Sequence, residues 1–588
     1  MSGLSLLEQI SDIAASDPRR PAVRAGEGLL DYGEVMSTVT DLRDQLRAQG
    51  VGPEDVVATV LPRGGNPIIA MLAIWMAGAA YLPVDVKWPE RRRELVLGEV
   101  ATFALEMSDG EAHGGMPGES GFRIRRLREG HTRVDGASAT ERNLAYVLCT
   151  SGSTGTPLAV GVEFGALDNY ARYLLDLVRQ PALHSEGDLR VLLSADLAFD
   201  ASLRPVLLLA AGAELIVAPD LTEGSWQDHI DCIAEHKVTV LSGVPSWYSG
   251  LLGAGYVPGD SAVQLAFIGG EAVPNGVVRQ LAASQSVVVQ YGPTETTVAA
   301  TGGRLVDDEF LEAPIGVPVP GAQIQLYRNV EFDPAIDGEP AYLYVGGAGV
   351  ARGYLSNPRL TAERFTPNPS GPPGSRLFRT GDLAKVSPQG AYSFLGRSDD
   401  QVKISGRRIE LSEISTVLNR HPAVAQSVAF VDRDSPNPLL VACYVGDRGA
   451  AESGEEAGVR EYLARELPSY EVPAVVRRVE SMPMTERGKV DVPALARLVK
   501  PAETDARDEE PDDPAMTDVE KRVIAIVRST LDLRCSLDDE FFTLGLSSLD
   551  SLNILAQIRE ELGVRVRLRD FFQARTTRNL CKLIGDVS

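Results

Sequence analysis

The stretch from Cys149 to Val160 combines two glycines with five hydroxyl side chains and follows a short apolar run at 144–148. Glycine allows backbone N–H groups to face an anion without a Cβ in the way, and hydroxyl groups add further donors. This stretch therefore predicts a phosphate-binding loop at the end of a strand, although an ordinary Gly/Ser-rich surface loop is the alternative that it leaves open. The residues expected in the loop are Thr150, Ser151, Gly152, Ser153, Thr154 and Gly155.

The loop resembles the phosphate loop of the adenylate-forming enzymes, whose usual pattern is Thr-Ser-Gly-Ser-Thr-Gly-x-Pro-Lys-Gly. One departure lies inside it, because Leu158 and Ala159 replace the usual Lys and Gly. A charge-assisted contact is worth about 1.5–3 kcal/mol, so its absence predicts weaker ATP capture. The resemblance extends over nearly the whole chain, in the stretches 81–85, 266–271, 291–297, 346–354, 361–365, 379–383, 396–410 and 482–491.

The resemblance implies an ATP and Mg²⁺ site whose residues lie far apart in the sequence. Tyr291 is expected near adenine, Thr294 at the α-phosphate and Glu295 on Mg²⁺, a hard cation that prefers oxygen ligands. Asp382 is expected to accept both ribose hydroxyls. Lys489 is expected to reach the substrate carboxylate and the bridging phosphate oxygen, so that it acts with Thr294 and Glu295 in catalysis. The other implied positions are Gly270 and Arg397 at the nucleotide and Asp399 as the pivot of a mobile subdomain.

Alternating strands and helices are expected to position these residues. A strand at 190–195 precedes Asp200, and parallel α/β sheets bind ligands near the C-terminal ends of their strands. Helices are predicted over 71–80 and 203–211, and 108–140 is interpreted as an irregular surface excursion.

Asp200 is the residue that separates amino-acid activation from fatty-acyl or aryl activation. The resemblance implies that its carboxylate pairs with the α-ammonium of an amino-acid substrate; the alternative is a helix N-cap formed by Asp200 or Ser202. If Arg204 faces the side-chain cavity, its buried guanidinium needs a polar or acidic partner, which suggests a polar or acidic α-amino acid. Exposure to solvent, or a protein carboxylate as partner, is the other possibility for Arg204. The remaining positions implied for this pocket are Ala201, Ser242, Ala266, Ile268, Gln290, Val298 and Ala299.

The composition changes after residue 498. Residues 499–514 are acidic and rich in proline, which favours an extended linker. Beyond it, helical periodicity predicts a small bundle, and Leu-Gly-Leu-Ser-Ser-Leu at 544–549 resembles the thiolation motif of carrier proteins, with 4′-phosphopantetheine on Ser548. The expected order is an α/β adenylation core made of several subdomains (1–396), a small mobile α+β subdomain (397–498), the linker, and an all-α four-helix carrier (515–588).

The resemblance as a whole implies a stand-alone adenylation and peptidyl-carrier didomain of the nonribosomal peptide synthetase type. Such a protein forms an aminoacyl-AMP from ATP and an amino acid, and then loads the amino acid as a thioester on its own phosphopantetheine arm. The implied partners are a phosphopantetheinyl transferase and a downstream condensation or tailoring enzyme, and the need for an MbtH-like protein stays open. An acyl- or aryl-CoA ligase and a catalytically degenerate carrier or scaffold are the competing functions.

Composition argues against several other classes of protein. The formal net charge of −24 disfavours a nucleic-acid groove or an anionic membrane surface as partner. Five widely spaced cysteines without a CxxC pair suit a reducing cytoplasm and no structural zinc. We therefore expect a cytoplasmic protein with neither a nucleic-acid nor a membrane partner.

Overall fold

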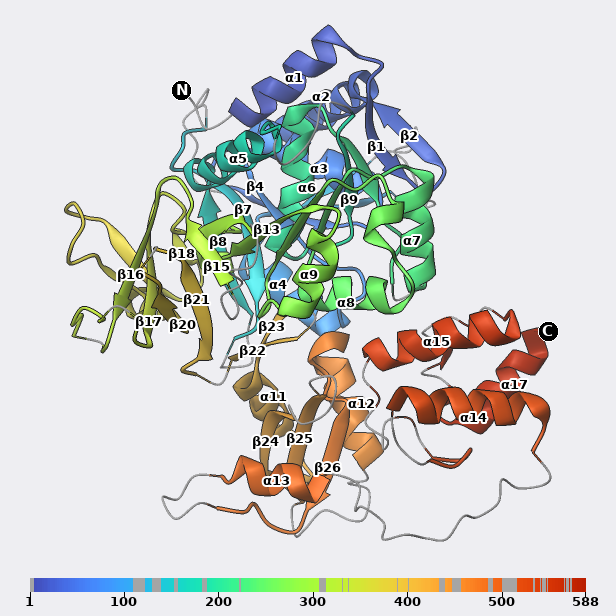
Figure 1. The fold of residues 1–588 in the computed structure, drawn as a ribbon. Helices are drawn as coiled ribbons and strands as arrows, with labels where there is room; N and C mark the ends of the chain where they lie inside the picture. The colour runs from blue at the N-terminus through green and yellow to red at the C-terminus, as the bar shows by residue number, and fades with distance from the viewer. Residues whose placement is uncertain are drawn as a thin grey trace.

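The structure is a computed structural model in which a large α/β region is followed by a small α+β subdomain and a helical carrier (Figure 1). None of the helices that it describes is long and apolar enough to cross a membrane. The described residues are 5–587 except 109–121, 129–138, 153–156, 182–187, 222–223, 306–313, 330, 337, 389, 400, 405, 433–438, 447–455, 485–489, 500–515, 532–534, 540, 542–545, 547, 565, 567–569 and 572–573.

Two sheets form the large region. The strands of the longer sheet, in spatial order, are β16 (Ala322–Tyr327), β17 (Ala341–Gly347), β20 (Arg376–Val386), β21 (Tyr392–Arg397), β15 (Pro314–Pro318), β14 (Thr301–Arg304), β13 (Ser286–Tyr291), β12 (Leu265–Gly269), β11 (Val240–Gly243), β9 (Arg190–Leu193), β10 (Glu214–Val217), β1 (Pro21–Ala25) and β2 (Gly28–Asp31), with β19 (Phe365–Pro367) beside β20. The strands of the second sheet are β18 (Gly353–Tyr354), β8 (Leu158–Glu163), β7 (Leu144–Thr150), β4 (Ala80–Pro83), β3 (Val56–Val60), β5 (Phe103–Met107) and β6 (Phe122–Arg126).

Helices pack on both sheets, and several of them share one core with strands of both sheets. Helix α3 has apolar residues on nearly every side, and 11 of its 12 residues are buried, as expected for a helix enclosed by protein. Its Trp75 indole donates to the Ala145 carbonyl at 2.8 Å, which ties the helix to the second sheet. The helices of this region are α1 (Ser5–Ser16), α2 (Tyr32–Ala48), α3 (Asn66–Ala77), α4 (Glu90–Glu99), α5 (Phe164–Val178), α6 (Leu203–Leu207), α7 (Trp226–Glu235), α8 (Pro245–Gly253), α9 (Asn275–Ala282) and α10 (Pro358–Arg364).

The parallel part of the longer sheet positions the residues expected to bind substrate. Strands β9, β11, β12 and β13 run parallel, so their C-terminal ends open on the same edge. Two short 3₁₀ turns follow at this edge, η1 (Asp200–Ser202) and η4 (Thr294–Thr296). The edge therefore brings together segments almost 100 residues apart in the chain.

The small subdomain begins with a hairpin of β22 (Gln401–Ile404) and β23 (Arg407–Glu410), which points into the large region (Figure 1). Behind the hairpin, a three-stranded sheet carries the remaining helices on its faces. These elements are α11 (Leu411–Leu418), β24 (Val424–Asp432), β25 (Leu439–Gly446), α12 (Glu456–Glu466), η5 (Ser469–Glu471), β26 (Val475–Val479) and α13 (Val492–Val499).

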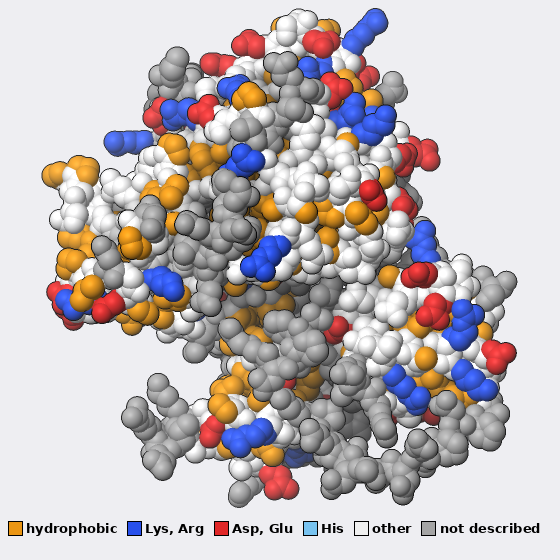
Figure 2. Space-filling model, viewed as in Figure 1, with side chains coloured by type: hydrophobic (Ala, Val, Ile, Leu, Met, Phe, Trp, Pro, Cys, Tyr) orange, Lys and Arg blue, Asp and Glu red, His pale blue; other side chains and the backbone are white. Residues whose placement is uncertain are grey.

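The carrier contributes the described helices α14 (Asp518–Leu531), α15 (Ser548–Leu562) and α17 (Thr577–Val587). Helix α15 contacts α7 and α8 of the large region. In Figure 1 the carrier lies beside the small subdomain, and Figure 2 shows Lys/Arg and Asp/Glu side chains intermingled over its surface. On the face that Figure 2 shows, the described part of the carrier therefore has no patch made of positive or of negative side chains alone.

Three sequence-based expectations about elements were wrong. The helix predicted over 71–80 ends at Ala77, because Gly78 adopts φ 85° and caps it in the left-handed conformation before β4 begins. The excursion 108–140 contains strand β6, which pairs antiparallel with β5. The helix predicted over 203–211 is α-helical only to Leu207 and then continues as a 3₁₀ turn, η2 (Leu208–Ala211), which Gly212 ends at φ 77°.

Candidate active site

Tyr291, Asp382, Arg397 and Asp399 form one hydrogen-bonded chain at the end of β13. The Tyr291 hydroxyl donates to one carboxylate oxygen of Asp382, and Arg397 Nη1 donates to the other. Arg397 also forms a bidentate pair with Asp399, at 2.7 Å from Nε and 3.0 Å from Nη2. Gly381, at φ 81°, makes room for this pair, since a Cβ there would lie 2.5 Å from the Asp399 carboxylate. Asp382, which is expected to bind ribose, is thus held by Arg397, which is expected to contact the nucleotide. Arg397 in turn pairs with Asp399, the expected pivot.

Glu295 is fully buried and carries one free carboxylate oxygen. Its Oε1 accepts hydrogen bonds from the Tyr354 hydroxyl and from Arg408 Nη1, both at 2.7 Å, whereas Oε2 is buried without a partner. Burial alone would raise the pKa of Glu295, but the Arg408 guanidinium and the Tyr354 hydroxyl more than offset it and hold that pKa below its ordinary value. An ionised carboxylate with an unused oxygen fits a Mg²⁺ ligand, which substrate phosphate oxygens would complete.

The turn after Glu295 has a strained backbone. Thr297 and Val298 both have positive φ, 59° and 63°, which is rare for β-branched residues. The Ala299 N–H donates to the Thr297 carbonyl at 2.7 Å, which closes a tight turn around Val298. The Thr297 hydroxyl donates to the Gly349 carbonyl at 2.7 Å and ties the turn to the loop after β17. Surrounding contacts therefore hold Thr297 and the expected pocket residue Val298 in a conformation that they would not adopt alone.

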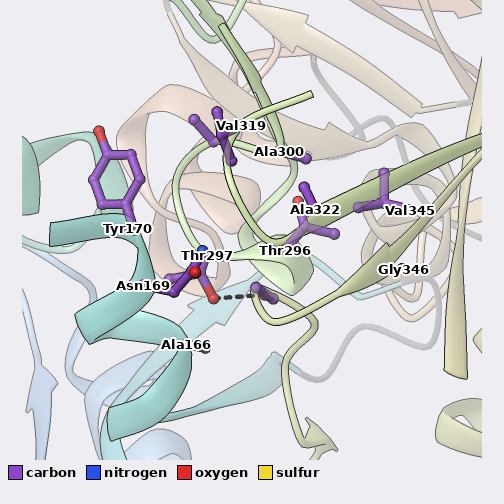
Figure 3. Close-up of a pocket in the computed structure, with 12 residues that line it drawn as sticks. Ala166, Asn169, Tyr170, Thr296, Thr297, Ala300, Val319, Ala322, Val345 and Gly346 are labelled. Atoms are coloured by element: carbon purple, nitrogen blue, oxygen red, sulfur yellow. Dashed lines mark hydrogen bonds between the residues drawn. The ribbon is translucent and has the colours of Figure 1, made fainter. Parts of the chain in front are cut away.

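A small cavity lies between this turn, α5 and the β15–β17 strands (Figure 3). Its wall includes Tyr170, Thr296 and Thr297, and Figure 3 shows the Thr297 side chain joined to the neighbouring loop. Of the residues expected in the substrate pocket, Ala299 lines this cavity. Arg204, Ser242 and Gln290 form a separate hydrogen-bonded group.

Asp200 opens η1, and its Oδ2 is buried without a hydrogen-bond partner among the residues that the structure describes. Neither η1 nor α6 has a side-chain N-cap bond, and the Ser202 hydroxyl donates instead to the Phe199 carbonyl, so the N-cap alternative is not what the structure has. Burial raises the pKa of Asp200 to about 6, although Lys403, the Thr294 hydroxyl and Arg204 oppose this rise. A buried carboxylate with a free oxygen is a fitting site for a substrate cation.

Arg204 lies one helical turn after Asp200 and is 4% exposed, so it does not point to solvent. It donates from Nε to Gln290 Oε1 at 2.8 Å and from Nη1 to Ser242 Oγ at 2.7 Å. The structure therefore brings together Asp200, Arg204, Ser242 and Gln290. Ala201 is half-buried in η1. Ala266 and Ile268 are buried on β12, but they alternate with Phe267, which faces Arg204, so their side chains lie on the opposite face of the sheet in the core with α7 and α8. The structure therefore does not bring these two expected pocket residues to Arg204.

Part of the phosphate loop is described, and its N-terminal end contacts the small subdomain. The Ser151 hydroxyl donates to the Arg408 carbonyl at 2.9 Å, and the Gly152 N–H donates to Glu413 at 2.8 Å. Leu158, where relatives have Lys, packs in the main hydrophobic core at 9% exposure. Ser153, Thr154 and Gly155 lie outside the described residues.

The sequence interpretation missed the part that the hairpin plays in this site. Arg408 pairs with Glu295, and Lys403 Nζ lies 6.0 Å from the centroid of the Tyr291 ring. The Gly406 N–H donates to Glu271 of the large region at 2.6 Å. Lys403 and Arg408 both belong to the stretch 396–410, which carried the resemblance. The positive charges of that stretch could therefore have indicated that it contributes to the site.

Lys489 lies outside the described residues. Met484 and Val490, on either side of the undescribed 485–489, pair in an antiparallel bridge, and Val490 packs with the core under α13. Figure 1 places α13 at the end of the small subdomain that is remote from the hairpin. Ser548 is the first residue of α15.

Family comparisons match three successive parts of the chain. The AMP-binding enzyme family matches 10–355, the AMP-binding enzyme C-terminal domain matches 413–489, and the phosphopantetheine attachment site matches 521–584. These matches define an AMP-forming ligase that uses ATP, with Mg²⁺ as its usual partner, joined to a carrier that bears phosphopantetheine. The chain belongs to the AMP-binding enzyme family and, within it, to the adenylation and carrier units of nonribosomal peptide synthetases.

Individual relatives agree with this assignment. The chain is 34% identical to Novobiocin biosynthesis protein H of Streptomyces niveus, over 93% of this chain and 90% of that protein. It is 35% identical to the probable non-canonical nonribosomal peptide synthetase CymA of Salinispora arenicola, over 95% of this chain, and spans only 7% of the length of that synthetase. Its fold is similar to that of holo-PA1221, an adenylation and PCP protein bound to a vinylsulfonamide inhibitor, with a TM-score of 0.80 at 23% identity over 99% of this chain and 97% of that one.

If the substrate is an amino acid whose ammonium group pairs with Asp200, the raised pKa of Asp200 predicts that its binding depends on pH. Below pH of about 6 the carboxyl is protonated and cannot pair with an ammonium group, whereas above it the carboxylate is available. The KM for the amino acid in pyrophosphate exchange is expected to rise about tenfold per pH unit below that pKa and to stay level above it. A KM for the amino acid that stays constant between pH 5 and 8 would contradict an ammonium partner for Asp200.

Proposed function

We propose that this chain activates an α-amino acid with ATP and loads it on the phosphopantetheine arm of its own carrier, as a unit of nonribosomal peptide biosynthesis. The observation that carries the amino-acid part is the buried, unpartnered oxygen of Asp200 at the end of the parallel sheet. A fatty-acyl or aryl acid has no cation for this oxygen. Because leaving a buried carboxylate unpaired is costly, the site favours a substrate with an ammonium group.

In the proposed nucleotide site, Tyr291 contacts adenine and Asp382 binds ribose. Glu295 would hold Mg²⁺ through its free oxygen, and Mg²⁺ supplies charge stabilisation at the phosphates. Thr294 and the hydroxyls of the phosphate loop donate hydrogen bonds to phosphate oxygens. Lys489 donates to the developing charge at the reacting carboxylate.

The hairpin suggests which half-reaction this arrangement serves. Arg408 neutralises Glu295, and the N-terminal end of the phosphate loop is bonded to the small subdomain. Val490 packs with α13, which lies at the end of that subdomain remote from the hairpin (Figure 1). We infer that this arrangement serves thioester formation, and that adenylation requires the small subdomain to turn about Asp399 and bring Lys489 to the site. The loaded carrier then hands its cargo to a condensation or tailoring enzyme.

The intact mass of the phosphopantetheinylated protein tests this function. The protein is incubated with Mg²⁺-ATP and pooled amino acids, with and without an MbtH-like protein, beside the Ser548→Ala variant. We expect one added aminoacyl mass in the wild type and none in the variant, because the variant lacks the attachment oxygen. Pyrophosphate exchange should remain in the variant, since adenylation does not need the carrier.

Two results would favour other functions. Pyrophosphate exchange that depends on an aryl or fatty acid, and on no amino acid, would indicate an acyl-activating ligase. Full phosphopantetheinylation without exchange for any acid would indicate a carrier that no longer adenylates, with Leu158 as the first candidate cause.

Docking of the carrier on α7 leads to a separate prediction. Arg559 of α15 donates to the Ser225 hydroxyl at 3.3 Å, and its Nη1 lies 3.6 Å from Asp228 Oδ1. Ser225 and Asp228 form the capping box of α7. Arg559→Glu would place like charges together and is expected to slow self-loading roughly fivefold, equivalent to about 1 kcal/mol, with less effect in high salt. The measurement is the rate of thioester formation at two ionic strengths.

The matched control is Arg522→Glu, the same charge reversal on α14, where Arg522 contacts Glu561 of the carrier itself. Pyrophosphate exchange should be unchanged in both variants. Equal loading rates for wild type and Arg559→Glu at low salt would show that this contact plays no part in productive docking.

A further inference from the structure

The Arg204 guanidinium is buried and has only neutral hydrogen-bond partners. Besides Gln290 and Ser242, its Nε donates to the Tyr170 hydroxyl at 3.2 Å, and its guanidinium carbon lies 5.4 Å from the centroid of the Phe267 ring. In the described part of the chain, no carboxylate lies within ion-pair distance of it, and Nη2 has no hydrogen-bond partner. The charge of Arg204 acts on Asp200 through space, but a buried cation without a carboxylate in direct contact is costly, so this arrangement favours a further anion.

A second group beside Arg204 also lacks an acceptor. Gln290 turns its Oε1 to Arg204 Nε, which fixes the orientation of the amide, and its Nε2 is buried without a hydrogen-bond partner in the described part of the protein. The free Nη2 and this Nε2 are both donors. Two unused donors, one of them charged, suit a carboxylate, which accepts through two oxygens.

The position of Asp200 limits what that anion can be. Asp200 and Arg204 are four residues apart across η1 and α6, and side chains at this spacing are neighbours on one helical face. Asp200 Oδ2 is free for a cation while Arg204 needs an anion. A ligand that satisfies both groups carries an ammonium and a carboxylate a few bonds apart, in addition to the carboxylate that is activated.

We infer that the substrate is an α-amino acid with an acidic side chain, of the aspartate or glutamate class, whose side-chain carboxylate binds Arg204 Nη2 and Gln290 Nε2. This inference rests on the proposed function and names its substrate class. Gln290, Ser242 and Tyr170 act as positioning residues, because their acceptor oxygens hold Nε and Nη1 and leave Nη2 for the ligand.

The test is ATP–pyrophosphate exchange with matched pairs of substrates. Aspartate is compared with asparagine and glutamate with glutamine, because each pair differs only in the charge and hydrogen-bonding of the side-chain terminus; leucine and benzoate complete the panel. We expect kcat/KM for one acidic amino acid to exceed that for its amide by at least about 30-fold, since the amide leaves the guanidinium unpaired. Arg204→Met should lower kcat/KM for the acid by a similar factor and favour the amide or leucine.

Arg172→Met is the matched control, because Arg172 lies on the exposed face of α5 and pairs with Asp168. It should keep the wild-type preference, and thermal melting of both variants shows whether they fold. If Arg204→Met does not fold, the wild-type comparison of acid with amide decides by itself. Exchange with neutral amino acids but not with acidic ones overturns this inference alone, whereas exchange with benzoate only, or with no acid, overturns the proposed function as well.

Discussion

Asp200→Asn is expected to lower kcat/KM for the amino acid in pyrophosphate exchange by about 30-fold to several thousand-fold. The loss follows from removing one partner of a buried charge pair, which costs roughly 2–5 kcal/mol because the ammonium would then be buried without a counter-charge. The substitution keeps the size of the side chain and accepts a hydrogen bond, so the change is mainly one of charge. The measurement is kcat and KM for the amino acid at saturating ATP.

A matched control is Asp188→Asn, which removes a charge from an exposed carboxylate just before β9. Its kinetics should match those of the wild type. A KM for ATP that stays constant in Asp200→Asn would assign the residue to the amino acid and not to the nucleotide. A loss of less than threefold in kcat/KM would mean that the substrate carries no ammonium at this position.

Lys489→Ala is expected to reduce adenylation by about 10²- to 10³-fold, because one positioned donor to developing charge is worth about 2.7–4 kcal/mol. Transfer from a separately prepared aminoacyl-adenylate to the carrier should be nearly unchanged, since in the arrangement proposed for that step the hairpin contributes Arg408 to the site. The two half-reactions are measured by pyrophosphate exchange and by the intact mass of the carrier.

Lys582→Ala on α17 provides the control for loss of a lysine, because Lys582 is exposed and contacts Asn579 of the same helix. A variant in which both half-reactions fall equally would contradict a role confined to adenylation. Normal adenylation in Lys489→Ala would exclude the residue from the reaction.

The sequence alone predicted the class of protein and the residues that carry its motifs. Local stretches such as 149–160 and 291–297 combine residue types that few functions require together. Their function could therefore be predicted without knowledge of the fold. Short apolar runs bounded by polar residues, such as β7 and β9, were also predictable as strands. Errors arose where one residue ended an element, as at Gly78, or where a strand such as β6 depended on its partner.

Only the tertiary structure decided which charges face each other. Arg408 and Glu295 are 113 residues apart, and no periodicity connects them, yet their ion pair joins the two subdomains. The sequence also left undecided whether Arg204 is buried or exposed, because what packs against a helix decides which of its faces is buried. The fold buries this face against Gln290 and Ser242, and that burial converts an ordinary arginine into a candidate for recognising acidic substrates. The sequence thus determined which functional groups the protein has. Packing determined how deeply each group is buried and which partners it contacts, and these set its charge state and its interactions.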